Sequence, residues 1–137
     1  MSAALFHGGV PGLEIGDRIL PPTTTKVRFT TPDAVCRRDR VYLTTERDEI
    51  AHLFALLYHG GRGDVYEVRP LGPVENDPDW KGAPGVCIAA QEATITSVVA
   101  RSVTNWYGHD ASEARKRLAF FWRLTASPAS QSRRAAA

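Results

Sequence analysis

Residues 41–57, VYLTTERDEIAHLFALL, join a short β-type run directly to a helical pattern. The first four residues, VYLT, are β-branched, aromatic and aliphatic, which is typical of a strand. Thr45 and Asp48 have the spacing of a capping box, with Asp in place of the usual Glu. An apolar stripe with the i, i+3, i+4, i+7 spacing of one helix face follows: Ile50, Leu53, Phe54 and Leu57. Gly60-Gly61 predicts the end of this helix.

Short β-type runs flank this unit on both sides. Residues 5–7 predict a first strand that stops at a tight Gly8-Gly9 turn, and residues 13–20 alternate weakly. Residues 64–69 predict a strand closed by Pro70, and residues 93–99 predict another. Glycine, proline and acidic residues predict a loop over residues 71–85, and polar residues predict a surface loop over residues 23–40.

A second helix is expected near the end of the chain. Asp110 and Glu113 form another capping-box signal, and an apolar face follows it: Ala114, Leu118, Phe121 and Trp122. The strands do not alternate regularly with helices, which favours an α+β fold over a doubly wound α/β fold. We therefore expect one domain over residues 1–124 and a flexible tail over residues 125–137, where Ser, Ala, Pro and Arg dominate.

Composition excludes several classes of protein. The chain has 137 residues, 43% of them hydrophobic and 23% charged, which are ordinary globular values. Seventeen basic and 15 acidic residues give a net charge of +2, too small by itself to indicate a nucleic-acid partner. Cys36 and Cys87 are expected as two reduced thiols rather than a disulfide. Without a signal pattern or a membrane-length apolar run, a cytoplasmic protein is expected.

Several common catalytic motifs are absent from the sequence. It contains no phosphate-binding GxxxxGK[ST], no GxGxxG after a strand, no GxSxG nucleophile elbow and no HExxH zinc helix. His52 and His59 are seven residues apart, so they share a helix face without being adjacent, and no further ligands lie within reach. No metal site is expected.

Three features remain as candidates for chemistry: Phe6-His7-Gly8, Val41-Tyr42-Leu43-Thr44 and Gly72-Pro73-Val74-Glu75-Asn76-Asp77-Pro78. Taken one at a time, each has a structural explanation: a surface histidine, a core tyrosine and a solvated acidic turn. Together, in this order and spacing, they resemble the bacterial rifamycin-inactivating ADP-ribosyltransferases. The resemblance runs from Phe6 to Asp110 and includes residues 15–20, 61–70 and 105–109, and Glu92.

The resemblance implies a small split sheet with a central cleft that binds NAD+ as co-substrate. His7 would hydrogen-bond the ribose on the nicotinamide side, the Gly8-Gly9 backbone would hold the carboxamide, and Tyr42 would stack on the nicotinamide ring. Asp77 would be the carboxylate near the reacting sugar carbon, and Glu92 is its rival. Such residue types suit the reaction, because a fixed carboxylate and an aromatic face stabilise the positive charge that develops when the N-glycosidic bond breaks.

The expected function is therefore mono-ADP-ribosyl transfer from NAD+ to a hydroxyl acceptor. A rifamycin antibiotic is one acceptor, which would make the chain an antibiotic-resistance enzyme. Three alternatives stay open: a toxin-like transferase acting on protein or nucleic acid, an RNA 2′-phosphotransferase that uses arginines such as Arg37, Arg38, Arg40 and Arg62, and an inactive nucleotide-binding module.

Overall fold

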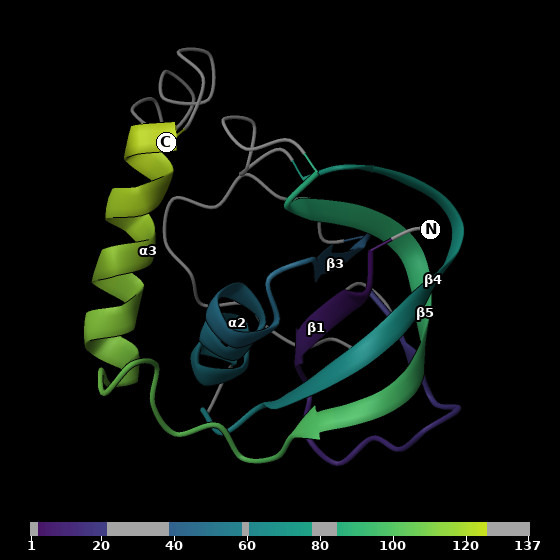
Figure 1. Ribbon diagram of the computed structural model, residues 1–137, viewed down its shortest axis with the longest axis horizontal. Helices are drawn as coiled ribbons and strands as arrows, with labels where there is room; N and C mark the ends of the chain where they lie inside the picture. Colours follow the sequence, from purple (N-terminus) through teal and green to yellow (C-terminus); the bar gives the residue numbers. More distant parts are fainter. Residues whose placement is uncertain (1–2, 22–38, 59–60, 78–84, 126–137) are drawn as a thin grey trace.

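The computed structural model describes residues 3–21, 39–58, 61–77 and 85–125 (Figure 1). These residues form a five-stranded antiparallel sheet with helices packed beside it, which confirms the α+β class. The strands are β1 (Leu5–Gly9), β2 (Arg18–Ile19), β3 (Val41–Thr44), β4 (Asp64–Asn76) and β5 (Cys87–Ala100). The helical elements are η1 (Arg47–Ala51), α2 (His52–Leu57) and α3 (Ala111–Thr125).

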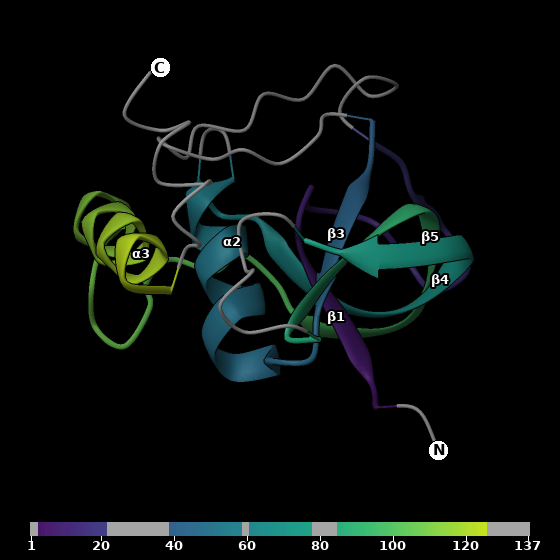
Figure 2. The same cartoon turned by 90° about the horizontal axis from the view of Figure 1, so that it is seen from above.

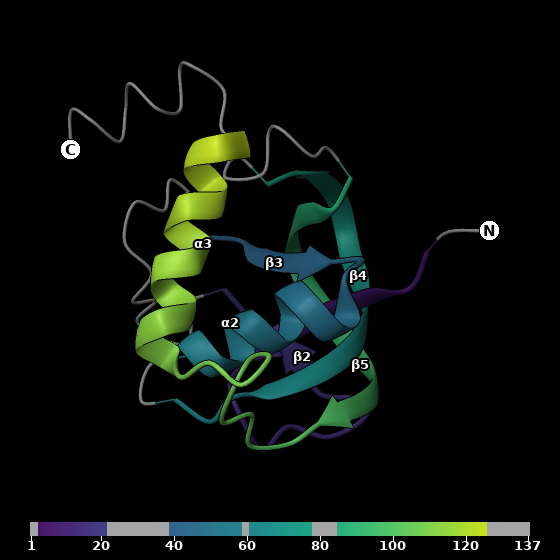
Figure 3. The same ribbon diagram turned by 60° about the vertical axis from the view of Figure 1, so that its left-hand side comes forward.

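The sheet curls because its two longest strands also pair with each other. Its order is β2-β5-β3-β1-β4, and β4 forms a further antiparallel ladder with β5. Figure 1 shows β4 and β5 as long curved ribbons, with β1 and β3 lying between them and α2. Seen from above in Figure 2, α2 separates α3 from the sheet. The view in Figure 3 agrees, so α2 packs on the sheet and α3 packs on α2.

Strand β3 matches its expected limits, whereas the other strands are longer or shorter than their sequence patterns indicate. Gly8 and Gly9 are not a turn after β1 but its last two residues, paired with Val65 and Asp64 of β4. In residues 13–20 only the pair Arg18–Ile19 forms a strand. The expected loop from residue 71 is also wrong, because β4 continues through Pro70 to Asn76. It can do so because β5, which begins at Cys87, supplies a partner along its whole length.

The first helical turn after β3 is π-helical, and its expected capping box is wrong. No side chain caps η1 at Glu46. Thr44 Oγ1 instead accepts the N–H of Glu46 at 3.0 Å, and the Asp48 carboxylate pairs with the guanidinium of Arg47 at 2.8 Å. Most of the expected apolar stripe is confirmed, since three of its members are buried: Ile50, Leu53 and Leu57. The α-helix ends at Leu57, before the Gly-Gly pair, of which Gly60 lies outside the described residues.

Two apolar clusters make up the core. One joins η1 and α2 to Phe6 of β1 and to Ala114 of α3, and the other joins residues of β3, β4 and β5 with Ile19 of β2. The helix stripe is therefore buried against one part of the sheet, while the curled strands enclose the second cluster. Burying such side chains supplies most of the stability of a domain of this size.

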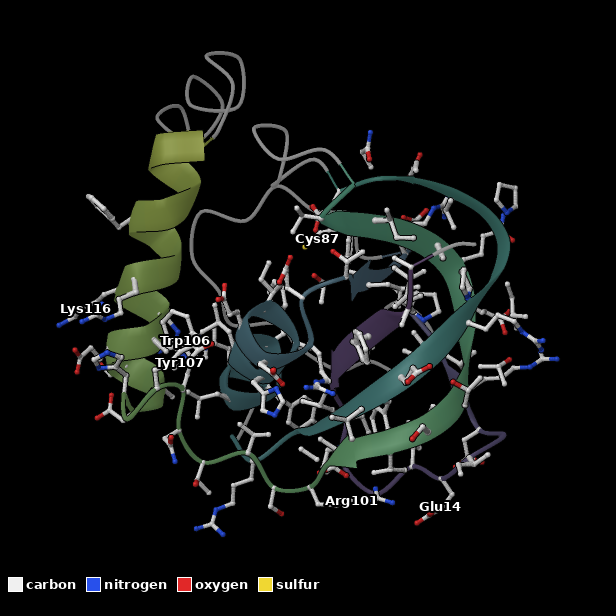
Figure 4. The ribbon with its side chains drawn as sticks, viewed as in Figure 1. Glu14, Cys87, Arg101, Trp106, Tyr107 and Lys116 are labelled. Atoms are coloured by element: carbon white, nitrogen blue, oxygen red, sulfur yellow. The ribbon has the colours of Figure 1, made fainter. Side chains whose placement is uncertain are left out.

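A tight turn leads into α3. The N–H and C=O groups of Trp106 and His109 exchange two hydrogen bonds of 2.9 Å, and the Tyr107 and Trp106 rings meet edge to face at 5.4 Å. Figure 4 shows both rings in this turn, beside the start of α3. The expected cap of α3 is confirmed, because Asp110 Oδ1 accepts the N–H of Glu113 at 2.9 Å. The side chains of Leu118, Phe121 and Trp122, and residues 126–137, lie outside the described part.

Candidate functional site

Strand β1 and helix α2 are in close contact because position 8 has no side chain. A Cβ atom built on Gly8 would overlap the carbonyl oxygen of Ala51 and would lie 2.7 Å from the backbone nitrogen of Ala55. Gly63 makes a second close approach, with its N–H donating to the Ala55 carbonyl at 3.0 Å. Glycine at these two positions therefore allows the helix to lie directly on the strand.

The pairing between β1 and β3, next to this contact, is short. In the described strands these two share one registered pair, Phe6 with Thr44. Beyond that pair the carbonyl of Tyr42 is bonded by the imidazole of His7, with Nδ1 and the oxygen 2.9 Å apart. This hydrogen bond ties the two expected site residues His7 and Tyr42 together.

His7 is held in one protonation state and one tautomer. Burial lowers the pKa of His7 below its ordinary value of 6.5, although the hydrogen bond with Tyr42 acts in the opposite direction. The ring is therefore neutral at pH 7, and because a carbonyl oxygen can only accept, the ring proton is on Nδ1. Nε2 is then a bare acceptor. A Cβ on Gly9 would lie 2.7 Å from Nε2, so position 9 has no room for a larger side chain beside this atom.

Tyr42 and Asp77 lie on opposite edges of the first residues of β5. Tyr42 is registered with Ala89, while the N–H of Asp77 donates to the carbonyl of Cys87 at 3.1 Å. Cys87, labelled in Figure 4, marks this end of the strand. Asp77 is buried, with 3% of its surface exposed. Two strand spacings, about 10 Å, separate the β3 and β4 backbones here.

Glu92, the rival carboxylate, lies apart from this group. It is three residues along β5 from Ala89, a separation of about 10 Å along the strand. Glu92 Oε1 pairs with Arg18 Nη1 of β2 at 3.2 Å, and both side chains are substantially exposed. The structure therefore joins the imidazole of His7 to the backbone of Tyr42, places Asp77 across β5 from Tyr42, and gives Glu92 a separate ion pair.

A cluster that the sequence patterns did not reveal lies at the other end of β4 and β5. The buried carboxylate of Asp64 accepts the N–H groups of Gly12 and Ser102, both at 2.8 Å, and pairs with Arg101 at 2.7 Å. Burial alone would raise the pKa of Asp64, but the Arg101 guanidinium and these N–H donors outweigh it and hold the pKa below its ordinary value. Arg101 also reaches Glu14 at 2.8 Å (Figure 4).

Tyr66 completes this cluster. It is fully buried, its hydroxyl donates to the carbonyl of Val10 and accepts the N–H of Leu13 at 3.1 Å, and Asp64 Oδ2 lies 3.3 Å away. Burial raises the pKa of Tyr66 to about 12, so the hydroxyl keeps its proton. No local pattern could have found this cluster, because all but one of its contacts join residues at least 37 positions apart in sequence.

The family of the chain follows from comparison with known proteins. The model of the family described as rifampin ADP-ribosyl transferase matches residues 5–106, well over half of the 137 residues. The chain belongs to the rifampin ADP-ribosyl transferase family. The match covers β1 to β5 with η1 and α2, and therefore includes His7, Tyr42, Asp77 and Glu92, while α3 lies beyond it. A search of curated proteins finds no significant match.

The described residues contain neither a cluster of metal ligands nor a helix that could span a membrane. Within residues 3–21, 39–58, 61–77 and 85–125, no group of three or more His, Cys, Asp or Glu side chains is placed to hold a metal ion. Over the same residues, no helix has the length and apolarity needed to cross a membrane. Cys36 lies outside the described residues, so the expectation of two reduced thiols stays a prediction.

Proposed function

We propose that this chain transfers the ADP-ribosyl group of NAD+ to a hydroxyl group of a rifamycin-type antibiotic. Family membership supports both the reaction class and the acceptor, because the description of the matched family names ADP-ribosyl transfer and rifampin. The proposed site rests on the hydrogen bond between His7 and the Tyr42 carbonyl, which joins β1 to β3.

The protonation state of His7 fits the ribose on the nicotinamide side of NAD+. A sugar hydroxyl needs an acceptor for its proton, and Nε2 of a neutral imidazole with its proton on Nδ1 is such an acceptor. The hydrogen bond to Tyr42 O fixes the direction of Nε2 before the substrate arrives, so little orientational freedom is lost on binding. Glycine at position 9 puts no side chain beside that nitrogen.

Tyr42 and Asp77 have complementary roles in this proposal. In the reaction, the bond between nicotinamide and the ribose C1′ breaks with its electron pair leaving on nicotinamide. The acceptor oxygen bonds to C1′, and its proton passes to solvent. The Tyr42 ring binds the face of the cationic nicotinamide ring. The Asp77 carboxylate stabilises the positive charge that develops on the ribose and orients the acceptor hydroxyl.

Asp77 is a better candidate than Glu92 for this carboxylate. Asp77 is buried and adjoins the strand end that pairs with β3. A buried group is held with little freedom, and it acts on a developing charge with less screening by water. Glu92 pairs with Arg18 at a water-exposed position, where a carboxylate stabilises a cation only weakly.

The test is to mix the protein with NAD+ and rifampicin and to measure nicotinamide release together with the mass of the drug. We expect the drug to gain the mass of one ADP-ribose. Release of nicotinamide with modification of protein or RNA, and none of the drug, would contradict the acceptor. Absence of nicotinamide release with every acceptor would contradict the transferase activity.

Separate Asp77→Ala and Glu92→Ala variants test the choice of carboxylate. We expect kcat to fall about 10²-fold in Asp77→Ala, a loss typical of removing one group that stabilises charge in the transition state. Glu92→Ala should change kcat much less, and it serves as the matched control because it also removes a carboxylate from the sheet. A larger loss of kcat in Glu92→Ala than in Asp77→Ala would show that Glu92 is the carboxylate that acts in the reaction.

A further inference from the structure

The segment that follows His7 is anchored by buried side chains that the proposed reaction does not use. Strand β1 ends at Gly9, and the next residues are held at three successive backbone groups. The Val10 carbonyl is bonded by the Tyr66 hydroxyl, the Gly12 N–H by Asp64, and the Leu13 N–H again by the Tyr66 hydroxyl. Three anchors in four residues fix this loop far more firmly than an ordinary surface loop.

Tyr66 connects this loop to His7 itself. In the β1–β4 ladder His7 is registered with Tyr66, and Gly9 with Asp64. Directly opposite residues of an antiparallel pair have Cβ atoms about 5 Å apart on the same face of the sheet. The Tyr66 side chain therefore starts beside the imidazole of His7 and ends, at its hydroxyl, on the loop that leaves β1.

Arg101 stiffens the cluster from the other side. Its guanidinium pairs with the buried Asp64 carboxylate, and the N–H of Ser102 binds the second carboxylate oxygen. The residues that follow β5 therefore fix the Asp64 carboxylate, and this carboxylate in turn accepts the Gly12 N–H of the loop after β1. The pair of Arg101 with Glu14 is more exposed, since 73% of the Glu14 side chain is accessible, and such pairs contribute little to stability.

We propose that Tyr66, supported by Asp64 and Arg101, is a positioning residue that sets the place of His7 and Gly9 for NAD+. The inference rests on the proposed function. Tyr66 does not touch the reacting atoms in this account. It fixes the strand end from which Nε2 of His7 receives the ribose hydroxyl, so its loss weakens NAD+ binding more than it slows the chemical step.

The decisive variant is Tyr66→Phe, which keeps the buried ring and deletes the hydroxyl alone. We expect the KM for NAD+ to rise about tenfold, the factor that corresponds to losing roughly one hydrogen bond, while kcat changes much less. Glu14→Gln is the matched control, because it removes only the exposed partner of Arg101. Its KM should equal that of the unaltered protein.

A second readout does not depend on turnover. NMR titration of the imidazole protons, with His7 assigned by its loss in His7→Asn, measures the pKa of His7 in each variant. We expect the pKa of His7 to rise toward 6.5 in Tyr66→Phe, because a displaced ring is less buried, and to stay unchanged in Glu14→Gln. A merely structural role of Tyr66 would lower the melting temperature and leave this pKa in place.

The outcomes separate the two proposals. A folded Tyr66→Phe protein with unchanged KM and unchanged His7 pKa would overturn the positioning role while the proposed function stands. If Tyr66→Phe does not fold, Arg101→Lys takes its place with the same expectations, since lysine keeps a positive charge for the buried Asp64 carboxylate but lacks the forked guanidinium. If the unaltered protein does not cleave NAD+, the proposed function fails, and the titration alone decides whether Tyr66 positions His7.

Discussion

The close contact between β1 and α2 makes Gly8→Ala the most sensitive test of the fold around the site. The added Cβ would overlap the carbonyl oxygen of Ala51 and would come within 2.7 Å of the Ala55 nitrogen. Both atoms are backbone atoms of η1 and α2, so no side-chain rotation can relieve the overlap. The helix must move away from the strand, and the apolar cluster that joins them must loosen.

The cost of this change can be estimated from the packing. Inserting a methyl group into a well-packed core typically costs about 1–3 kcal/mol, and an unyielding backbone neighbour puts Gly8 at the upper end, about 3 kcal/mol. That is a large part of the roughly 5–15 kcal/mol by which domains are stable. For a chain of this length it corresponds to a fall in Tm of about 10 °C.

Gly9→Ala provides the matched comparison. Its Cβ would lie 2.7 Å from Nε2 of His7, the far end of a side chain that can rotate away. Rotation breaks the hydrogen bond to the Tyr42 carbonyl, a net loss of about 1 kcal/mol. Gly9→Ala should therefore keep most of the stability and lose NAD+ turnover.

Urea unfolding and calorimetry of the two variants measure these effects, with nicotinamide release as the activity readout. A free energy of unfolding for Gly8→Ala within about 0.5 kcal/mol of the unaltered protein, a change typical of neutral surface substitutions, would refute the reasoning. So would a Gly9→Ala variant that is less stable than Gly8→Ala.

Two further predictions concern pH and helix capping. Because burial holds the pKa of His7 below 6.5 in the folded protein, the unfolded chain binds more protons in the pH range just below 6.5. Stability should therefore fall as the pH is lowered through that range, and urea unfolding at pH 7 and pH 5 should show a smaller fall in His7→Asn. Asp110→Ala removes the carboxylate that accepts the Glu113 N–H, and it should lower the free energy of unfolding by about 1 kcal/mol. Calorimetry should show this loss as a lower Tm. An unchanged Tm would mean that α3 does not depend on this cap.

The sequence predicts a strand well where its local composition favours a strand and a neighbouring strand pairs with it over the same residues. Strand β3 needs no correction, because its composition alone marks residues 41–44 and a partner lies on each edge. Strand β4 shows the limit of such reasoning. Pro70 and Gly72-Pro73 are signals for a loop, yet the ladder with β5 continues past them, helped by a register shift between Leu71 and Val74 and a left-handed Gly72. The hydrogen bonds and side-chain contacts with β5 therefore outweigh the local preference of these proline and glycine residues for a loop.

The candidate site was predictable in part. His7, Tyr42 and Asp77 stood out because their order and spacing resemble a family, and the family is confirmed by the match over residues 5–106. Their roles stay predictions. The hydrogen bond of His7 with Tyr42 O and the anchoring by Tyr66 join positions 35 and 56 residues apart, and no pattern in one segment reports such a contact.

The double pairing of β5 has a consequence for how the chain acquires its structure. β5 bonds to β2 and β3 on one edge and to β4 on the other, yet it is the last strand to be synthesised. Until residues 87–100 have left the ribosome, β2 has no partner and β3 and β4 lack one of theirs, so the barrel-like sheet closes late. A nascent chain that pauses before Cys87 leaves strand edges unpaired, and unpaired edges are the part of a sheet that most readily pairs with another chain.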